Sequence, residues 1–298
     1  MYATCTICNS APTFLEWNGL PIAQCTQCGL AWRRSFALPE GHYEEKDIDT
    51  GSEKVSARRR NNDSRRSLLA RYTALSGVCD IGCGEGLFVE GVLAVGGHCI
   101  GIDPGAEPVA FGIERGLPIR LGRIEDLPQI ALEYPLRVST MFELIEHLSD
   151  PLSALQTVYS ALPVGGVLMI ETPNFAAPSI TKRQYRHSLV YPEHLFYFTE
   201  ATLAAIVAKA GFHVRAHGRR HFDEDHLALS QSLELLGVRM RSDAAAADYQ
   251  FRMEPGQSEA SPTSSNNSPF RSIARTALAR IVRLLGRGEY QWLIAVKQ

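Results

Sequence analysis

The sequence predicts an α/β fold, in which a mainly parallel β-sheet has helices on both faces and follows a small cysteine-rich module. Three observations support this prediction. Short apolar runs alternate with segments of helical character from residue 77 to residue 217. The first two of these runs end in polar signals, three closely spaced glycines and then a carboxylate. Two pairs of cysteines lie ahead of the alternating region.

The length and composition are those of an ordinary globular protein. The chain has 298 residues, of which 45% are hydrophobic and 21% are charged, enough for one α/β domain and an appendage. The net charge of -2 gives no general attraction to nucleic acid. Apolar runs stay short of the roughly 20 residues that cross a bilayer. The first residues, MYATCTICNS, lack the basic and apolar regions of a signal peptide, so we expect a cytoplasmic protein.

The first predicted unit is a zinc ribbon over residues 1–35. Its two CxxC pairs have the spacing of such ribbons, and their members are Cys5, Cys8, Cys25 and Cys28. Four thiolates in this arrangement close a tetrahedral site for one structural Zn²⁺ ion. Disulfides are the first alternative, which a reducing compartment disfavours, and a redox CxxC is the second, which lacks its βαβ context here. Between the pairs, Asn18–Gly19 favours a hairpin turn.

A polar, acidic stretch follows at 36–56, and we interpret it as a linker or a lid. Residues 57–75 have helical character and carry several arginines. A solvated helix face is the common explanation of such a charge cluster, and contact with RNA is the alternative.

The main domain is predicted to occupy residues 57–298. Turn signals bound its strands, which we expect near 77–81, 98–102, 119–122, 137–142, 165–171 and 213–217, with a last strand in the C-terminal YQWLIAVKQ. Helices are expected near 86–95, 106–115, 151–161 and 199–210. Strands that alternate with helices in this way favour a parallel sheet.

An insertion at about 222–287 separates the sixth strand from the last one. Low complexity at 254–269 indicates disorder within it. Residues 270–286 have the pattern of an amphipathic helix rich in arginine. We expect this helix to pack against the sheet edge, and peripheral contact with an anionic membrane is the alternative.

The glycines after the first strand form a turn suited to a ligand. Gly82, Gly84 and Gly86 alternate along the chain, and Asp103 ends the second strand, where a carboxylate can accept hydrogen bonds from ribose hydroxyls. The spacing is GxGxG rather than the GxGxxG of dinucleotide sites, and Asp80 precedes it. A carboxylate there would repel a pyrophosphate and would tolerate a cationic ligand.

DIGCGEG followed by GID resembles the S-adenosylmethionine (SAM) site of class I methyltransferases, over half to two-thirds of the chain. The resemblance implies a Rossmann-like sheet of seven strands in the order 3-2-1-4-5-7-6, with the last strand antiparallel. It implies that Asp103 binds the ribose of SAM, and that Ile102 and Pro104 flank the adenine. Either Glu125 or Asp126 would accept from the adenine amino group. The other residues that would border SAM are Asp80, Gly82, Cys83, Gly84, Gly86, Phe142 and Leu144.

A second candidate group follows the fourth strand of the main domain. Glu143, Glu146 and His147 form ExxEH, whose members would share one face of a helix. The pattern is similar to ubiquinone-pathway O-methyltransferases and small-RNA 2′-O-methyltransferases, in which an acid–acid–His cluster holds a metal. His194, in YPEHLF, is the candidate fourth ligand. Such an ion, for example Mg²⁺, would favour the alkoxide of a substrate.

Two alternatives to a metal remain at this group. His147 or His194 would act as a general base without an ion, or these residues only cap and pack. The candidate catalytic residues are therefore His147, His194 and Glu143.

The resemblance extends to a bacterial group of methyltransferases tied to glycan or secondary-metabolite assembly. It implies methyl transfer to a small-molecule or saccharide acceptor, with oxygen as the favoured atom. An RNA methyltransferase is the enzymatic alternative, motivated by the ribbon and the arginines of 58–66. Only Arg33 and Arg34 accompany the ribbon, so we do not favour nucleic acid as the partner. A zinc-ribbon scaffold that binds SAM without turnover is the non-enzymatic alternative.

Overall fold

The computed structural model describes residues 2–35, 52–220 and 288–298. The insertion predicted at 222–287, with its amphipathic helix at 270–286, lies outside the described residues. Most of the linker or lid predicted at 36–56 also lies outside them. Its last residues belong to helix α1 (Ser52–Leu69), which begins earlier than the helix predicted from residue 57.

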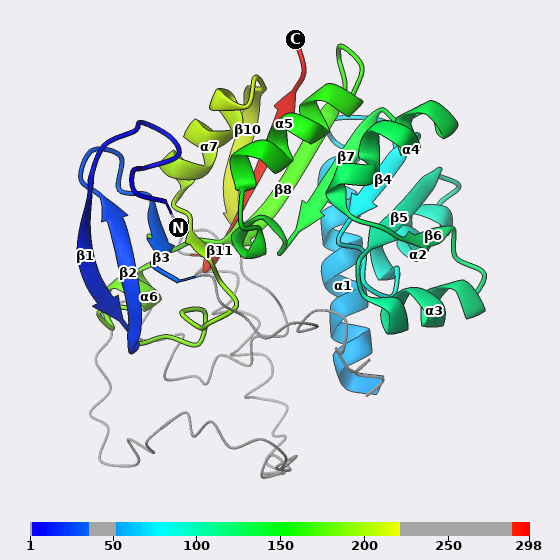
Figure 1. Ribbon diagram of the computed structural model, residues 1–298. Coiled ribbons are helices and arrows are strands. Elements are labelled where there is room, and N and C mark those ends of the chain that lie inside the picture. Colours follow the sequence, from blue (N-terminus) through cyan, green and yellow to red (C-terminus); the bar gives the residue numbers. More distant parts are fainter. Residues whose placement is uncertain (1, 36–51, 221–287) are drawn as a thin grey trace.

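A seven-stranded sheet forms the centre of the main domain (Figure 1). The strand order is β10-β11-β8-β7-β4-β5-β6, which confirms the predicted order 3-2-1-4-5-7-6. Neighbouring strands from β8 to β6 are parallel, whereas β11 is antiparallel to both β8 and β10. The strands are β4 (Val78–Ile81), β5 (Cys99–Asp103), β6 (Ile119–Leu121), β7 (Val138–Phe142), β8 (Val167–Pro173), β10 (His213–Arg220) and β11 (Tyr290–Val296). Every residue of β4, β7 and β8 is buried, as expected for strands covered on both faces.

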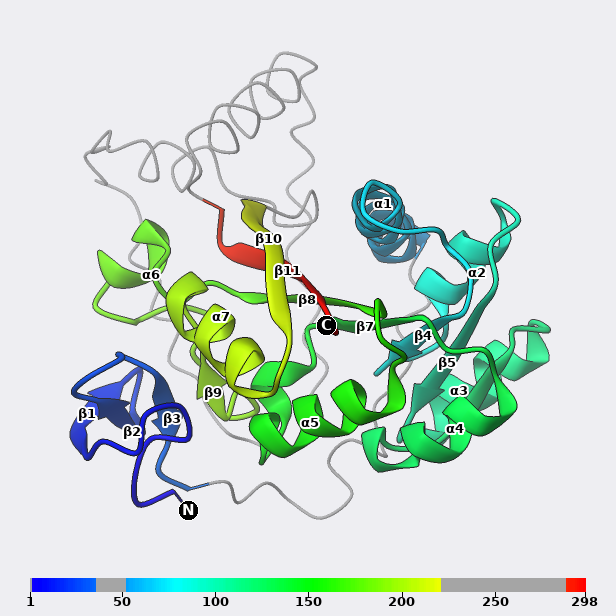
Figure 2. The ribbon, with the colours of Figure 1, turned by 90° about the horizontal axis from the view of Figure 1, so that it is seen from above.

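Helices cover both faces of this sheet (Figure 2). One hydrophobic cluster joins the sheet to α1, α2 (Leu87–Leu93) and α3 (Ala106–Glu114). A second cluster joins the other face to α4 (Leu127–Glu133), α5 (Pro151–Ala161) and α7 (Glu200–Lys209). The sequence did not predict α4, which is short and begins beside a proline. Among the described residues, no helix has both the length and the hydropathy required to cross a bilayer.

The N-terminal module is a small antiparallel sheet beside α7 (Figure 1). Its strands are β1 (Pro12–Trp17), β2 (Leu20–Cys25) and β3 (Ala31–Arg33). Asn18 and Gly19 join the first two with φ values of 51° and 78°, the left-handed pair that a two-residue hairpin turn needs. The fourth strand of this sheet is β9 (Phe196–Tyr197), which belongs to the main domain. The module is therefore joined to the domain by strand pairing.

Three short elements complete the described chain: η1 (Ile124–Asp126), η2 (Ile145–His147) and α6 (Pro178–Thr181). The second of these lies directly after β7, at the carboxyl edge of the sheet. The strand order reverses at β4, because β5 and β6 lie on one side of it and β7 and β8 on the other. A ligand crevice is expected at such a reversal, beyond the carboxyl ends of the strands.

Candidate active site and metal centre

The carboxylate of Asp103 lies at the end of β5, against the glycine turn that follows β4. Its Oδ2 accepts a hydrogen bond from Gly84 N at 2.9 Å, and its Oδ1 accepts one from Gly105 N at 2.8 Å. The side chain is only half-buried. Because each carboxylate oxygen has a second lone pair, Asp103 can still accept hydrogen bonds from a pair of ribose hydroxyls.

The glycine turn is fixed to β5 and leaves room above its backbone. The amides of Gly82 and Cys83 both donate to Ile102 O, at 2.8 and 3.1 Å. Gly84 has φ +53°, and a Cβ added there would meet no heavy atom within 4 Å. At Gly82 a Cβ would lie 3.2 Å from the δ carbons of Leu144. The space for a ligand is therefore open at Gly84, whereas Gly82 makes room for the Leu144 side chain.

Asp80 lies beneath the turn rather than on its surface. Its side chain is 3% exposed, and Thr140 Oγ1 donates to its Oδ1 at 2.7 Å. Burial raises the pKa of Asp80 to about 7, against the opposing effects of Thr140 and Arg65. Its ionised form therefore depends on a positive charge nearby, which agrees with a cationic ligand in the crevice.

The side chain of Ile102, which the resemblance places beside the adenine, is 1% exposed and belongs to the hydrophobic core. Pro104, in contrast, is half-buried at the strand end. Glu125 is exposed in η1, whereas the Asp126 carboxylate accepts from Arg123 N at 2.8 Å.

Two more of the predicted SAM contacts have buried side chains. The Phe142 ring is 8% exposed and packs edge-on against Phe88, with centroids 4.8 Å apart. Cys83 is 9% exposed, and a Cβ added at Gly101 would lie 2.6 Å from its sulfur. Cys83 can therefore meet a ligand only through its backbone. Gly86 is the N-cap of α2 and packs against Leu117.

Glu143 is held by an arginine from α1. Arg65 Nη2 lies 2.5 Å from Glu143 Oε1, and Glu143 has φ +52°, just before the turn η2. The predicted helical face of ExxEH therefore does not form, because residues 145–147 are a 3₁₀ turn that excludes Glu143. Glu143 is not a member of the group that brings Glu146 and His147 together with His194.

That group, the acid–histidine group, consists of Glu146, His147 and His194. One candidate ligand atom from each lies within 4.8 Å of the others, and Glu146 Oε1 is 3.9 Å from His194 Nε2. Nδ1 of His194 lies 2.7 Å from Leu189 O, and Nδ1 of His147 lies 3.0 Å from Glu193 O. Carbonyl oxygens only accept, so Nδ1 is the donor in both rings, and in a neutral ring Nε2 is then the acceptor nitrogen. This tautomer suits a metal ligand or a general base.

Glu146 has the environment of a perturbed acid. Its side chain is fully buried, and Thr172 Oγ1 donates to its Oε2 at 2.8 Å. The other oxygen, Oε1, has no hydrogen-bond partner among the described residues and faces His194. Burial raises the pKa of Glu146 to about 8. An unpartnered buried carboxylate oxygen is costly unless a proton, an imidazolium or a cation compensates it.

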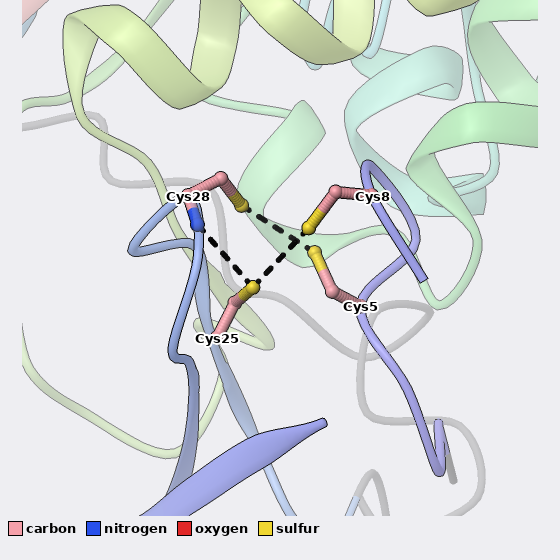
Figure 3. Close-up of side chains that lie close together, drawn as sticks. All are labelled: Cys5, Cys8, Cys25 and Cys28. Atoms are coloured by element: carbon pink, nitrogen blue, oxygen red, sulfur yellow. Dashed lines mark hydrogen bonds between the residues drawn. The ribbon is translucent and has the colours of Figure 1, made fainter. Parts of the chain in front are cut away.

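The four N-terminal cysteines converge between the two knuckles of the module (Figure 3). Their sulfurs lie within 4.8 Å of one another, with Cys5 and Cys28 3.5 Å apart and Cys8 and Cys25 3.3 Å apart. All four are free cysteines in the structure. Backbone amides of Gln27 and Cys28 donate to the Cys25 sulfur at 3.4 Å. Four converging sulfurs with amide donors fit a tetrahedral Zn²⁺ site, so this group can hold zinc.

Sequence reasoning missed a buried ion network next to the acid–histidine group. The Glu171 carboxylate in β8 is fully buried, and it pairs with Arg65 Nε at 2.7 Å and Arg220 Nη1 at 3.0 Å. Arg65 also stacks on the Phe142 ring at 4.7 Å. The two arginines and the glutamate are far apart in the sequence and match no motif. Only the glutamate in an otherwise apolar strand hints that a buried partner is required.

Comparison with known proteins agrees with this geometry. The seven-stranded sheet has the order that the resemblance to class I methyltransferases implies, and its glycine turn faces a strand-end carboxylate. A family described as a methyltransferase domain matches residues 54–217, more than half of the 298 residues, so the chain belongs to that family. This membership agrees with the resemblance to class I methyltransferases seen in DIGCGEG and GID.

Part of the chain is also similar to curated O-methyltransferases. A ubiquinone biosynthesis O-methyltransferase of Marinobacter nauticus is 36% identical over 124 residues, 38% of this chain and 51% of that protein. Its counterpart from Aeromonas salmonicida is 29% identical over 159 residues, 49% and 66% of the two chains. The chain thus spans about half to two-thirds of the length of these relatives. A SAM-dependent methyltransferase of Archaeoglobus fulgidus, 21% identical with a TM-score of 0.51, shares the fold over 82% of this chain and 97% of its own.

Proposed function

We propose that this enzyme transfers the methyl group of SAM to a hydroxyl oxygen of a small-molecule or saccharide acceptor. The main support is the acid–histidine group, which presents the Nε2 of His194 3.9 Å from the buried Glu146 carboxylate. A hydroxyl is a weak nucleophile at neutral pH, so its methylation benefits from a base or a metal ion. The O-methyltransferases among the relatives give independent support for oxygen.

The donor half of the site would be formed by the glycine turn and Asp103. When bound, SAM supplies a methyl group already activated by its sulfonium. Asp103 would accept hydrogen bonds from the ribose, and the open backbone at Gly84 would admit the methionine half. Asp80 would contribute negative charge beneath that half, since a cation nearby favours its ionised form. These residues bind and orient, and alignment is the larger share of catalysis in such a transfer.

The acceptor half would be formed by the acid–histidine group. With its proton on Nδ1, His194 can take the hydroxyl proton at Nε2, and Glu146 would stabilise the resulting imidazolium. The same atoms, with His147, offer one carboxylate and two imidazole ligands, a set that also fits a divalent ion such as Mg²⁺. A bound ion would polarise the acceptor hydroxyl and favour its alkoxide.

A small acceptor is supported over RNA by the way the arginines are used. Arg58 and Arg59 pair with Glu85 and Glu90 at 2.7 and 2.6 Å. Arg65 is buried, and so is Arg33 of the module. Arginines neutralised by neighbouring carboxylates or enclosed in the fold offer little to a phosphate backbone.

We further propose that the four cysteines hold one structural Zn²⁺ ion. A unit as small as the module gains little stability from its own core, and a structural ion would supply part of the folding free energy that it lacks.

The proposed function is tested with radiolabelled SAM and a panel of phenols, catechols and sugars. Methyl transfer to a hydroxyl should fall at least about a hundredfold in His194→Gln, which removes a base or ligand. His217→Gln is the matched control, because His217 is exposed on β10 away from the group. Full activity in His194→Gln would contradict the assignment, and so would a labelled product methylated only on nitrogen or carbon.

A second experiment separates the base from the metal. Mn²⁺ serves as the probe, and its binding is followed by electron paramagnetic resonance in the wild type, Glu146→Gln and His194→Gln. A metal site predicts binding that both substitutions abolish and activity that EDTA removes and Mg²⁺ restores. A general base predicts no Mn²⁺ binding at these residues and activity that is indifferent to EDTA.

A further inference from the structure

The cysteine-rich module and the segment that contains His194 form one continuous hydrogen-bonded structure. β3 is antiparallel to β9, with Ala31 opposite Tyr197 and Trp32 opposite Phe196. The ladder extends one residue further, because Arg33 N donates to Leu195 O at 2.8 Å.

Leu195 also joins the module to the acid–histidine group by hydrogen bonds. Leu195 N donates to Glu146 O at 2.8 Å, so a single residue accepts from the module and donates to the turn η2. His194 immediately precedes Leu195, and Nδ1 of His147 contacts Glu193 O within the same stretch. The position of all three group members therefore depends on residues 193–195.

The Arg33 side chain braces the same stretch from its other end. Arg33 is 8% exposed, and its Nη1 donates to Pro192 O. Its backbone thus holds Leu195 while its guanidinium holds Pro192, and His194 lies between these two attachments. Residues 191–195 form turns without a helix or strand of their own. Their geometry must come from outside contacts, and Arg33 supplies two of them.

The module also contacts the chain segment whose carbonyl sets the tautomer of His194. Trp17 stacks on Tyr185, with ring centroids 3.7 Å apart and planes 5° apart. Asn18 Nδ2 donates to Val190 O at 2.9 Å. The neighbouring carbonyl, Leu189 O, is the one that Nδ1 of His194 contacts. The hairpin tip of the module therefore fixes the chain beside the carbonyl that keeps the proton on Nδ1.

We propose that the module is a positioning element for the acceptor half of the active site. Through Arg33 and the hairpin tip it holds the turn that presents His194 to Glu146. The donor half is shaped separately, by hydrogen bonds between residues 82–84 and 102–105. Folding of the module around its ion would then decide whether His194 is in place, while SAM binding would not depend on it. The inference rests on the proposed function only in taking His194 as the acceptor-side residue.

The test uses the full chain with ¹⁵N-labelled histidine, and the readout is the ring nitrogen spectrum of His194, assigned with His194→Gln. Arg33→Met keeps the apolar stem of the arginine and removes the bond to Pro192. Arg34→Met is the matched control, because Arg34 is the exposed neighbour on the same strand end. SAM affinity by titration calorimetry and zinc content by atomic emission are measured on each variant.

We expect Arg33→Met to lose the fixed Nδ1–H tautomer of His194, so that its two nitrogen shifts move toward a common average. SAM affinity should stay within twofold of the wild type, with one zinc per chain retained. Arg33→Lys should restore the fixed tautomer in part, because an ammonium can still donate to Pro192 O. Arg34→Met should resemble the wild type in every measurement.

A second variant keeps the inference testable if Arg33→Met does not fold. Asn18→Gly removes the bond to Val190 O and tolerates the left-handed φ of the hairpin tip. It should alter the same histidine signals. Wild-type His194 signals in both variants would overturn the proposal, and so would a joint loss of SAM binding. If His194→Gln keeps full methyl transfer, the proposed function fails. The histidine spectra of the other variants would still show whether the module positions His194.

Discussion

Arg65 and Glu143 form an ion pair of 2.5 Å that joins helix α1 to the end of β7. The same guanidinium pairs with the fully buried Glu171 and stacks on Phe142. This contact draws the first acid of ExxEH toward α1, whereas Glu146 and His147 turn toward His194. The motif therefore divides between an ion pair with α1 and the acid–histidine group.

We predict that Arg65→Met destabilises the fold strongly. Removing one partner of a buried ion pair costs about 3 kcal/mol, because the remaining charge, here that of Glu171, stays buried. The loss should be at the lower end of the usual range, because Glu171 still pairs with Arg220. Urea denaturation followed by fluorescence measures the change in unfolding free energy. Arg66→Met is the control, since its pair with Asp63 is a solvated i,i+3 contact worth under about 1 kcal/mol. Equal midpoints for the two variants would contradict a buried network.

We predict that Gly84→Ala impairs SAM binding more than it impairs folding. The left-handed φ of +53° costs an alanine roughly 1 kcal/mol, while the added methyl projects into the space that the ligand would occupy. Gly116→Ala is the matched control, because Gly116 has φ +76° and equally open surroundings. Gly116 lies in the turn between α3 and β6, away from the predicted SAM crevice. Calorimetric titration should show SAM affinity at least about tenfold weaker in Gly84→Ala alone. Similar affinities in the two variants would place the donor elsewhere.

We predict that Asp80→Asn stabilises the donor-free protein at neutral pH. Burial raises the pKa of Asp80 to about 7, above its unfolded value near 3.9, so the folded state holds a proton that the unfolded state releases. The contribution of Asp80 to stability is then complete below about pH 4 and is lost as the pH rises through 7. Thermal melts should show that the unfolding free energy of the variant increases relative to that of the wild type as the pH rises from 4 to 8. The change should be at most about 4 kcal/mol. A constant difference across this range would indicate that Asp80 is ionised throughout.

We predict that Cys25→Ser lowers the zinc content from one ion per chain to none. Removing one of four thiolates weakens a tetrahedral site greatly and should also lower the melting temperature. Atomic emission on dialysed protein gives the metal content. Cys99→Ala, in the core strand β5, should keep its zinc, and equal zinc in both variants would argue against the four-cysteine site.

The elements that the sequence predicted are those whose evidence is local. The buried strands β4, β5, β7 and β8 follow from apolar runs bounded by turn residues. The elements it missed are short, and one of them depends on a distant partner. β9 has two residues and exists because it pairs with β3, more than 160 positions earlier.

The candidate site divides in the same way. The predicted neighbours Gly84 and Asp103 do meet, because consecutive parallel strands end at one edge of the sheet. A helical period suggested that Glu143 and Glu146 share a face, but the chain turns at Glu143 and Arg65 binds it. No spacing rule could reveal that ion pair, since its partners lie 78 positions apart.

The sequence by itself determined the class of this protein. The features that determined it are periodic or closely spaced: the order of strands and helices, the glycine turn, the acid after it and the paired cysteines. Such local patterns follow from backbone geometry, so they can be recognised without the tertiary structure. Only the tertiary structure decided which charged groups are buried together and which turn brings His194 to Glu146. These contacts depend on packing between segments far apart in the chain, where burial makes each unpaired charge costly and so selects its partner.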